Sequence, residues 1–419
     1  MNLRPSAIGR LLTAAVLSVA LSALAFAATP AHKPGKPAAV AVAPKKEAPR
    51  NKDEPIINAP HAILIAAENG SVLFDRDPDQ LIFPASLAKL MTAEYVFHEL
   101  KEGRIKLTDE YRVSENAWRK GGAPSHGSTM FAAINSKISV DDLLHGMIIQ
   151  SGNDACIVLA EGIAGNEAEF AAKMTERARE IGLPKSTFGN SNGLPDPGTH
   201  VTTRELGMLA RRIILDYPEL YKIFGQPDFT WGKIRQPNRN PLLGSVVGAD
   251  GLKTGFTKEA GYGLVGSAVQ DGLRLIVVVN GLKNAKERAD EAKKLLDWGF
   301  RSFEQRNLFA EGQIIGSAKV YGGASGYVPL QASGLVKTMV PKSGGERLIA
   351  RIAYQGPVPA PITQGQQIGL LKVWRDDKLV LQLPLTAAES VAKGNISQRA
   401  FDAVSEMVIA LFRAGAERL

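Results

Sequence analysis

Two residues one helical turn apart, Ser86 and Lys89, carry the side chains needed for nucleophilic catalysis. They stand in the segment PASLAKLMTA, whose apolar positions predict the first turns of a buried helix that begins after Pro84. On such a helix the i, i+3 spacing places both side chains on one face. A serine hydroxyl is a good nucleophile only when a base removes its proton, and a lysine is a base only when burial or a second cation keeps it neutral. The apolar surroundings of Lys89 supply the burial.

The Ser-x-x-Lys pattern alone carries little weight, because a chain of 419 residues contains it about once by chance. A second match, Ser390 with Lys393, lies in a stretch without other chemical features. Two further motifs follow the first match along the chain: Ser-Gly-Asn at 151–153, and Lys-Thr-Gly at 253–255, just ahead of a predicted strand pair. The three motifs together indicate a catalytic site.

With these motifs the chain resembles the penicillin-binding proteins and class A β-lactamases, which carry Ser-x-x-Lys, Ser-Asp-Asn and Lys-Thr-Gly in this order. Gly152 stands where that pattern has Asp. The resemblance implies a role for each motif. Ser151 would relay a proton between Lys89 and a leaving amine. Asn153 would hold the substrate amide and Lys89.

The third motif and its neighbour complete the implied site. Lys253 would supply the second positive charge, Thr254 would bind a terminal carboxylate, and Gly255 would let a substrate backbone lie against the strand. The backbone N–H groups of Ser86 and Phe256 would form the oxyanion hole.

A narrower resemblance covers about residues 55–415, nearly the whole mature chain. It is to the low-molecular-mass penicillin-binding proteins that are serine D-alanyl-D-alanine carboxypeptidases of the DacA type. It includes the stretches SGNDAC, NGL (192–194), NRN, DGLKTG and KKLLDWGFR. It implies that the penultimate D-Ala of a peptidoglycan stem peptide acylates Ser86, that terminal D-Ala leaves, and that water then frees the enzyme. β-Lactams would acylate the same serine. Arg239 and Arg288 would lie near the substrate carboxylate.

Phe256 is a departure from the pattern of some relatives, which have His after Lys-Thr-Gly. If only the backbone N–H of Phe256 serves the oxyanion, the change has little effect. If this side chain tunes Lys253, the pH dependence and the rate of the reaction differ from those of the relatives that have His.

The elements that must position these residues form two blocks. Apolar runs in 61–77, joined by Asn-Gly, predict a hairpin because that pair accepts positive φ. Helical patterns dominate 86–221, a second hairpin follows over 261–282, and 285–303 reads as a helix. Strands at both ends with helices between them predict an α+β domain over 55–306, whose terminal strands share one antiparallel sheet. By resemblance this is a β-lactamase/transpeptidase-like domain.

Two further segments follow that domain. Short strands separated by Gly, Pro and Asp turns predict a small all-β domain over 307–396. Residues 397–419 have one apolar face with charges opposite it, which predicts an amphipathic helix. Its charges and length do not allow it to span a bilayer. It would lie in the membrane interface or dock on its own domain.

The N-terminus indicates export. Residues 1–28 combine Arg4 and Arg10, an apolar run and Ala25-Phe26-Ala27, which is typical of a cleaved secretory signal; an uncleaved anchor is the alternative. Residues 29–54, rich in Pro, Ala and Lys, read as a disordered linker. The expected location is the periplasmic face of the inner membrane, with peripheral attachment.

Composition excludes several classes of protein. The net charge of +8 includes no basic run interleaved with aromatic residues, so no nucleic-acid partner is expected. A single cysteine, Cys156, excludes an internal disulfide framework and is expected to be a small buried hydrophobe. The six histidines show no metal-ligand spacing, and phosphate loops and dinucleotide fingerprints are absent, so no metal or cofactor is expected.

Three alternatives stay open at this point. A serine β-lactamase needs a base for the deacylating water, and Glu205 is the nearest candidate between the second and third motifs. A DD-endopeptidase would use the same catalytic residues on cross-linked peptides. A non-catalytic envelope scaffold would keep the fold, although the intact motif set argues against it.

Overall fold

The computed structural model describes residues 54–344, 347–375, 378–400 and 402–403. The predicted signal segment 1–28, the predicted linker up to residue 53 and most of the predicted helix 397–419 lie outside the described residues.

The first domain is built on a five-stranded antiparallel sheet in the order β2-β1-β9-β8-β7. Both predicted hairpins are present, and strands from the two ends of the domain lie side by side, because β1 pairs with β9. The prediction that the terminal strands share one antiparallel sheet is therefore confirmed. The strands are β1 (His61–Ala66), β2 (Val72–Arg76), β7 (Ala249–Thr257), β8 (Gly261–Gln270) and β9 (Leu273–Leu282).

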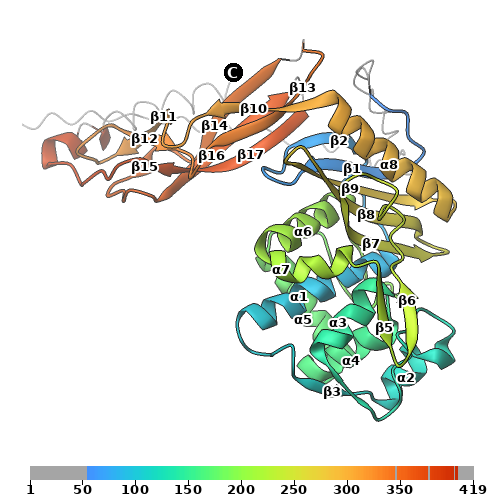
Figure 1. The fold of residues 1–419 in the computed structure, drawn as a ribbon. Coiled ribbons are helices and arrows are strands. Elements are labelled where there is room, and N and C mark those ends of the chain that lie inside the picture. The colour runs from blue at the N-terminus through green and yellow to red at the C-terminus, as the bar shows by residue number, and fades with distance from the viewer. Residues whose placement is uncertain (1–53, 345–346, 376–377, 401, 404–419) are drawn as a thin grey trace, which may run out of the picture. The chain divides into compact units, whose positions relative to one another are not determined.

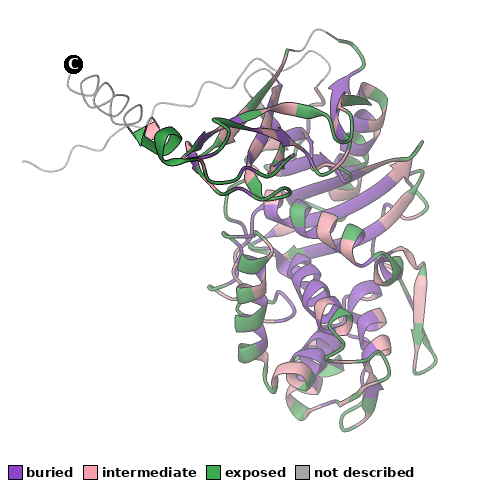
Figure 2. Ribbon diagram, turned by 90° about the vertical axis from the view of Figure 1, so that its left-hand side faces the viewer, coloured by how far each residue is buried: buried purple, intermediate pink, exposed green. Residues whose placement is uncertain are grey.

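Helices cover both faces of this sheet (Figure 1). Alternate residues of a strand point to opposite faces, and β1 follows this rule. Ile63 and Ile65 belong to the core shared with the larger helical layer, whereas Leu64 packs in a second core with Leu295 and Leu296 of α8. Figure 2 shows the sheet and the helix faces turned toward it as buried. The helices are α1 (Lys89–Lys101), α2 (Glu115–Gly121), α3 (Val140–Ile149), α4 (Asn153–Ala164), α5 (Glu167–Glu180), α6 (Thr203–Asp216), α7 (Pro218–Tyr221) and α8 (Ala285–Ser302).

Most of the longer helices begin with a side-chain cap, in which an oxygen accepts from the backbone N–H three residues on. The capping residues are Ser114, Ser139, Asn166, Thr202 and Asn284. Helix α4 is different, because it starts after Gly152 without a side-chain cap. Helix α1 also begins without one.

Short elements connect the helices. They are the 3-10 turns η1 (Ala85–Ala88), η2 (Ala123–Ser125) and η3 (Lys222–Gly225), and two small hairpins. The hairpins consist of β3 (Glu110–Arg112) with β4 (Lys137–Ser139), and β5 (Asp228–Trp231) with β6 (Ile234–Pro237).

An all-β domain follows α8, as predicted. Six strands form a sheet in the order β14-β16-β17-β12-β11-β15, and β10 pairs separately with β13. The sheet has its own apolar core, which includes Val328, Leu330, Leu371 and Leu385. The strands are β10 (Phe303–Phe309), β11 (Ile314–Tyr321), β12 (Tyr327–Gln331), β13 (Val336–Pro341), β14 (Leu348–Tyr354), β15 (Val358–Pro359), β16 (Gln367–Arg375) and β17 (Lys378–Ala387).

Candidate active site

Ser86 lies on the 3-10 turn η1, and Lys89 is the first residue of α1. In a 3-10 turn the side chains at i and i+3 are eclipsed, so these two side chains meet. Lys89 Nζ lies 2.9 Å from Ser86 Oγ, and the predicted same-face arrangement is present. Ala85, just before the serine, has φ of +48°, a left-handed conformation that a residue with a Cβ rarely adopts. The serine is thus presented on a strained turn.

The ammonium of Lys89 is 1% exposed and is held by oxygen atoms that carry no formal charge. It donates to Ser86 Oγ, to Asn153 Oδ1 at 2.8 Å and to the backbone oxygen of Asn192 at 2.6 Å. None of the ion pairs of the described residues involves this ammonium. Burial, with a contribution from the Arg239 charge, lowers the pKa of Lys89 to about 8. The neutral amine that a general base requires is therefore accessible.

Ser151 and Asn153 occupy the connection between α3 and α4. Ser151 has φ of +65° and is 2% exposed, and its Oγ has no hydrogen-bond partner among the described residues. A buried hydroxyl without a hydrogen-bond partner, on a residue with a strained backbone, is unusual away from functional sites. Asn153 opens α4, where its backbone N–H donates to Ser128 O at 2.8 Å and its Oδ1 accepts from Lys89.

The glycine between them is required by close packing. A Cβ on Gly152 would stand 2.9 Å from Asp154 Oδ1 and 3.1 Å from the backbone N of Met130. Asp154 is fully buried and accepts from Thr129 Oγ1 and from the backbone N–H groups of Met130 and Ala132, at 2.6–3.0 Å. This carboxylate fixes the loop that faces the start of α4.

Lys253 and Thr254 come from β7, the edge strand of the sheet. Lys253 is 3% exposed, and its Nζ donates to Thr254 O at 3.2 Å. Burial is the main cause that lowers the pKa of Lys253 well below its usual value, followed by the positive charges of Lys89 and Arg239. The charge of Lys89 therefore disfavours the charged form of Lys253.

Gly255 packs closely against the turn that carries Ser86. A Cβ at this position would stand 3.0 Å from Pro84 O and 3.2 Å from the backbone N of Leu87. The glycine thus allows β7 to lie against the turn that carries Ser86. This contact between strand and turn fixes the lysine of β7 relative to the nucleophile.

The remaining predicted site residues lie around β7 and the turn η1. They are Arg239, Arg288 and Phe256. Arg239 is exposed, and its Nη1 donates to Ser128 Oγ at 2.6 Å. Arg288, in the first turn of α8, has its guanidinium 5.6 Å from the Tyr262 ring centroid. Tyr262 in turn stacks on the exposed ring of Phe256, with centroids 4.1 Å apart. The Nε of Arg288 is buried and has no hydrogen-bond partner among the described residues.

Sequence reasoning missed the contribution of the loop that follows α5. Asn192 holds Lys89 with a backbone oxygen, which residue type does not reveal, although the Asn-Gly pair marks a turn. Gly193 has φ of +76°. The loop is fixed by Glu167, whose Oε1 accepts from Ser191 Oγ at 2.8 Å and from Asn192 Nδ2 at 3.3 Å.

The side chains of Glu205 and Cys156 make structural contacts. The carboxylate of Glu205 accepts from the backbone N–H of Lys185 at 2.9 Å and from Ser186 Oγ at 2.5 Å, so it fixes the start of α6. Cys156 is fully buried with its Sγ 3.2 Å from Gly152 O, and burial raises the pKa of the thiol to about 12. The prediction of a buried cysteine is confirmed.

Among the described residues no group of three or more His, Cys, Asp or Glu side chains could hold a metal ion. None of the described helices is both long and apolar enough to cross a bilayer.

A serine, two buried lysines and a serine–asparagine pair in one α+β domain define an acyl-transfer enzyme of the penicillin-recognising class. The family model described as D-alanyl-D-alanine carboxypeptidase matches residues 47–284, and the one described as penicillin-binding protein 5, C-terminal domain, matches residues 303–393. The chain belongs to the D-alanyl-D-alanine carboxypeptidase family and is a serine-type carboxypeptidase.

Individual relatives agree with this assignment. The chain is 39% identical over 355 residues to D-alanyl-D-alanine carboxypeptidase DacC of Escherichia coli, covering 84% of this chain and 89% of that protein. It is 37% identical over 361 residues to DacA of Haemophilus influenzae, covering 85% and 91%. These relatives favour the predicted carboxypeptidase over the β-lactamase, endopeptidase and scaffold alternatives.

Solved structures give the same result. Penicillin-binding protein 5 from Haemophilus influenzae superposes with a TM-score of 0.70 at 38% identity, covering 81% of this chain and 99% of that one. Penicillin-binding protein D2 from Listeria monocytogenes in its ampicillin-bound form gives 0.53 at 32% identity, covering 58% and 98%.

Proposed function

We propose that Ser86 is the nucleophile of this carboxypeptidase and Lys89 its general base. The contact that supports this most directly is that of Lys89 Nζ with Ser86 Oγ, made by a buried ammonium whose other partners are uncharged oxygens. In its neutral form Lys89 takes the proton of Ser86 while Oγ forms a bond to the carbonyl carbon of the penultimate D-Ala. The N–H groups of Ser86 and Phe256 receive the developing oxyanion.

The proton then moves to the leaving group. Lys89 passes it through Ser151 Oγ, the unpartnered hydroxyl, to the amine nitrogen of the terminal D-Ala, and the carbon–nitrogen bond breaks. This leaves an ester on Ser86 and free D-Ala. Water then attacks the ester, the stem tetrapeptide leaves, and Ser86 regains its proton. Asn153 holds both Lys89 and the substrate amide.

Positive charges select the C-terminal end of the substrate. Thr254 and the guanidinium groups of Arg239 and Arg288 bind the terminal carboxylate, while Lys253 supplies a charge beside it. Arg288 supports this role most directly, because it is half-buried and its Nε has no hydrogen-bond partner among the described residues, so it gains from an incoming anion. A β-lactam carboxylate binds in the same way, so β-lactams acylate Ser86.

An intact-mass time course with benzylpenicillin tests the assignment. The protein should gain one adduct, mapped to Ser86, that persists for many minutes, and it should release D-Ala from a stem pentapeptide. A folded Ser86→Ala protein should do neither. Release of D-Ala from that variant would overturn the assignment, and an adduct lost within seconds would point to a β-lactamase.

We further propose where the enzyme acts. Residues 1–28 direct export and 29–54 form a linker to the catalytic domain, while the amphipathic segment 397–419 holds the protein on the periplasmic face of the inner membrane. The apolar face and opposing charges of this last segment in the sequence support peripheral attachment. Cell fractionation tests it: a chain truncated after 396 should move from the membrane pellet to the soluble periplasmic fraction, and continued pelleting would contradict the role.

A further inference from the structure

A cavity of about 490 Å³ is lined by residues of both described domains. Its volume lies within the range of small-molecule sites, about 300–1,000 Å³. The lining comes from α6, from the hairpin of β1 and β2, and from the start of β17. The two domains meet beside it, because Asn69 Nδ2 donates to Lys337 O at 2.5 Å and Lys337 Nζ pairs with Glu68 at 2.9 Å.

Helix α6 presents two different faces. One face, which includes Leu209, packs in the core of the catalytic domain. The other consists of Arg204, Met208, Arg211 and Leu215, which follow one another at intervals of three and four residues and so form one stripe along the helix. All four residues of this stripe line the cavity.

The cavity has an apolar surface that is open to a ligand. Met208 and Leu215 of α6 are 41% and 47% exposed, and Leu379 of β17 is 43% exposed. Single exposed apolar side chains are common, but large ones that converge on one cavity from separate elements are typical of a binding site. A ligand of this cavity therefore has an apolar part.

The lining also carries an excess of positive charge. Of the described residues that line the cavity, three are arginines and one is an acid, Asp216. Arg204 pairs with Asp79 at 3.0 Å. Arg212 pairs with Glu94 at 3.0 Å and with Asp216 at 3.3 Å, so the acid of the lining already has a partner.

Arg211, the third arginine, has no carboxylate partner in the described part of the chain. Its Nε donates to Ala67 O at 2.5 Å and its Nη2 to Glu68 O at 2.9 Å, which fixes the guanidinium against the turn between β1 and β2. Burial lowers the pKa of Arg211, although Asp216 acts in the opposite direction. A guanidinium that is partly desolvated and bound by backbone oxygens gains from an incoming anion.

We propose that this cavity binds an amphipathic anion, which is an apolar chain that ends in one carboxylate or phosphate group. The chain would lie on Met208, Leu215 and Leu379, and the anionic group would pair with Arg211. Among the described residues that line the cavity, none takes part in the proposed mechanism, so this site is separate from that of Ser86.

Decanoate and decyl phosphate are the probes, and decyltrimethylammonium, with the same chain and the opposite charge, is the comparison. Isothermal titration calorimetry with the whole protein, below the micelle concentration, measures each Kd. We expect an anion to bind at least about ten-fold more tightly than the cation, the size that a charge-assisted hydrogen bond supports. Both anions, or either alone, would support the site; decanoate alone would indicate a fatty acid and decyl phosphate alone a lipid phosphate. Equal affinity for the cation, or binding of neither anion, would overturn it.

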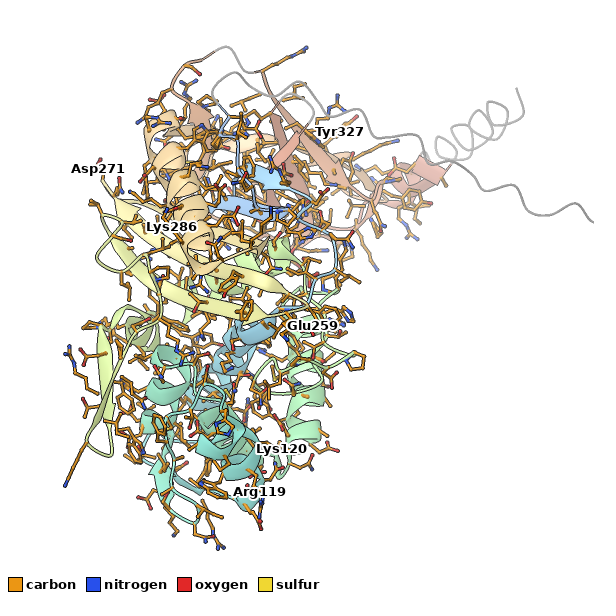
Figure 3. All side chains as sticks on the ribbon, turned by 90° about the vertical axis from the view of Figure 1, so that its right-hand side faces the viewer. Arg119, Lys120, Glu259, Asp271, Lys286 and Tyr327 are labelled. Atoms are coloured by element: carbon orange, nitrogen blue, oxygen red, sulfur yellow. The ribbon has the colours of Figure 1, made fainter. Side chains whose placement is uncertain are left out.

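Three variants locate the binding. Met208→Glu places a carboxylate three residues before Arg211 on the same helix face, where it pairs with the guanidinium, and it should weaken anion binding at least about ten-fold. Met208→Gln has the same shape without the charge and should bind nearly as the wild type does. Tyr327→Glu adds the same acid at an apolar position that is 60% exposed on β12 of the all-β domain, outside the cavity (Figure 3), and should keep the wild-type Kd.

All three variants should be acylated by benzylpenicillin at the wild-type rate, which shows that they are folded. If Met208→Glu is not acylated, Leu215→Glu takes its place, because it puts the acid four residues after Arg211 on the same face. An unchanged Kd in the glutamate variant, or an equal loss in Met208→Gln, would overturn the proposal, since the anion would then bind elsewhere or without Arg211.

Discussion

Gly193 and Ala85 are in direct backbone contact: a Cβ on Gly193 would stand 1.9 Å from the carbonyl oxygen of Ala85. The loop that gives Lys89 its backbone acceptor therefore lies directly against the turn that carries Ser86. Nucleophile, base and loop form one packed unit, and the loop is attached to α5 through Glu167.

Replacing Gly193 by Ala should break this unit. The new methyl group collides with Ala85 and displaces Asn192 O from Lys89, so acylation by benzylpenicillin should slow at least about ten-fold, since an unpaired buried group costs about 1–3 kcal/mol. Stopped-flow or intact-mass kinetics measure the rate.

A matched glycine separates the collision from backbone strain. Gly182 also has positive φ, +82°, but a Cβ there meets nothing within 4 Å. Gly182→Ala should lose about 1 kcal/mol of stability from strain and keep the acylation rate. Equal acylation rates in the two variants would show that the contact with Ala85 does not matter for chemistry.

The pH dependence of acylation follows from Lys89. Only the neutral amine accepts the proton of Ser86, and burial lowers its pKa to about 8. The acylation rate should therefore rise with pH and level off above about 8. A rate constant with benzylpenicillin measured from pH 6 to 9.5 checks this. A profile that falls over this interval would exclude Lys89 as the base.

Lys89 should also make stability depend on pH. Its pKa is about 8 in the folded protein and near 10.5 in the unfolded chain, so the unfolded state binds more protons between these values. The free energy of unfolding should therefore rise as pH increases from about 8, by an amount on the order of 3 kcal/mol once pH passes the unfolded value. Urea denaturation of Lys89→Met should show a shallower rise between about pH 8 and 9.5 than wild type. Identical slopes would indicate an ammonium that is solvated in the folded protein.

The Tyr262 ring should act as a support for Arg288. The guanidinium lies over this ring, and Phe256 stacks on the same ring. Tyr262→Leu removes the support, so KM for a D-Ala-D-Ala peptide should rise several-fold, in line with about 1 kcal/mol for a cation–π contact, with little change in kcat. Tyr262→Phe keeps the ring and should keep KM. A leucine variant with unchanged KM would show that Arg288 holds its position without the ring.

Cys156 should be unreactive in the native enzyme. Its thiol is fully buried, and burial raises its pKa to about 12, so almost no thiolate is present at neutral pH. Iodoacetamide should label nothing in the folded protein and one thiol per chain after denaturation. Rapid stoichiometric labelling of native protein would contradict the burial.

The chemistry of this site could be predicted largely from the sequence because its main groups are side chains in short, ordered motifs. Ser86 and Lys89 meet as their spacing requires, and both predicted hairpins are present as antiparallel strand pairs. What could not be predicted comes from contacts between distant segments. Asn192 acts through its backbone oxygen, about 100 residues from Lys89, and no side-chain pattern encodes such a contact. The close packing of Gly255 against Pro84 is a second contact of this kind.

The pairing of β1 with β9 has a consequence for the order in which the enzyme can assemble. Ala66 and Leu275 face each other although about 200 residues separate them, so the first hairpin has no partner until almost the whole catalytic domain has been synthesised. Such non-local pairing makes folding slow, since a long loop must close before the contacts form. Lys253 lies on β7, which joins the same sheet through β8. A partly synthesised chain thus has Ser86 but no working catalyst, and penicillin sensitivity should arise only once β9 has closed the sheet.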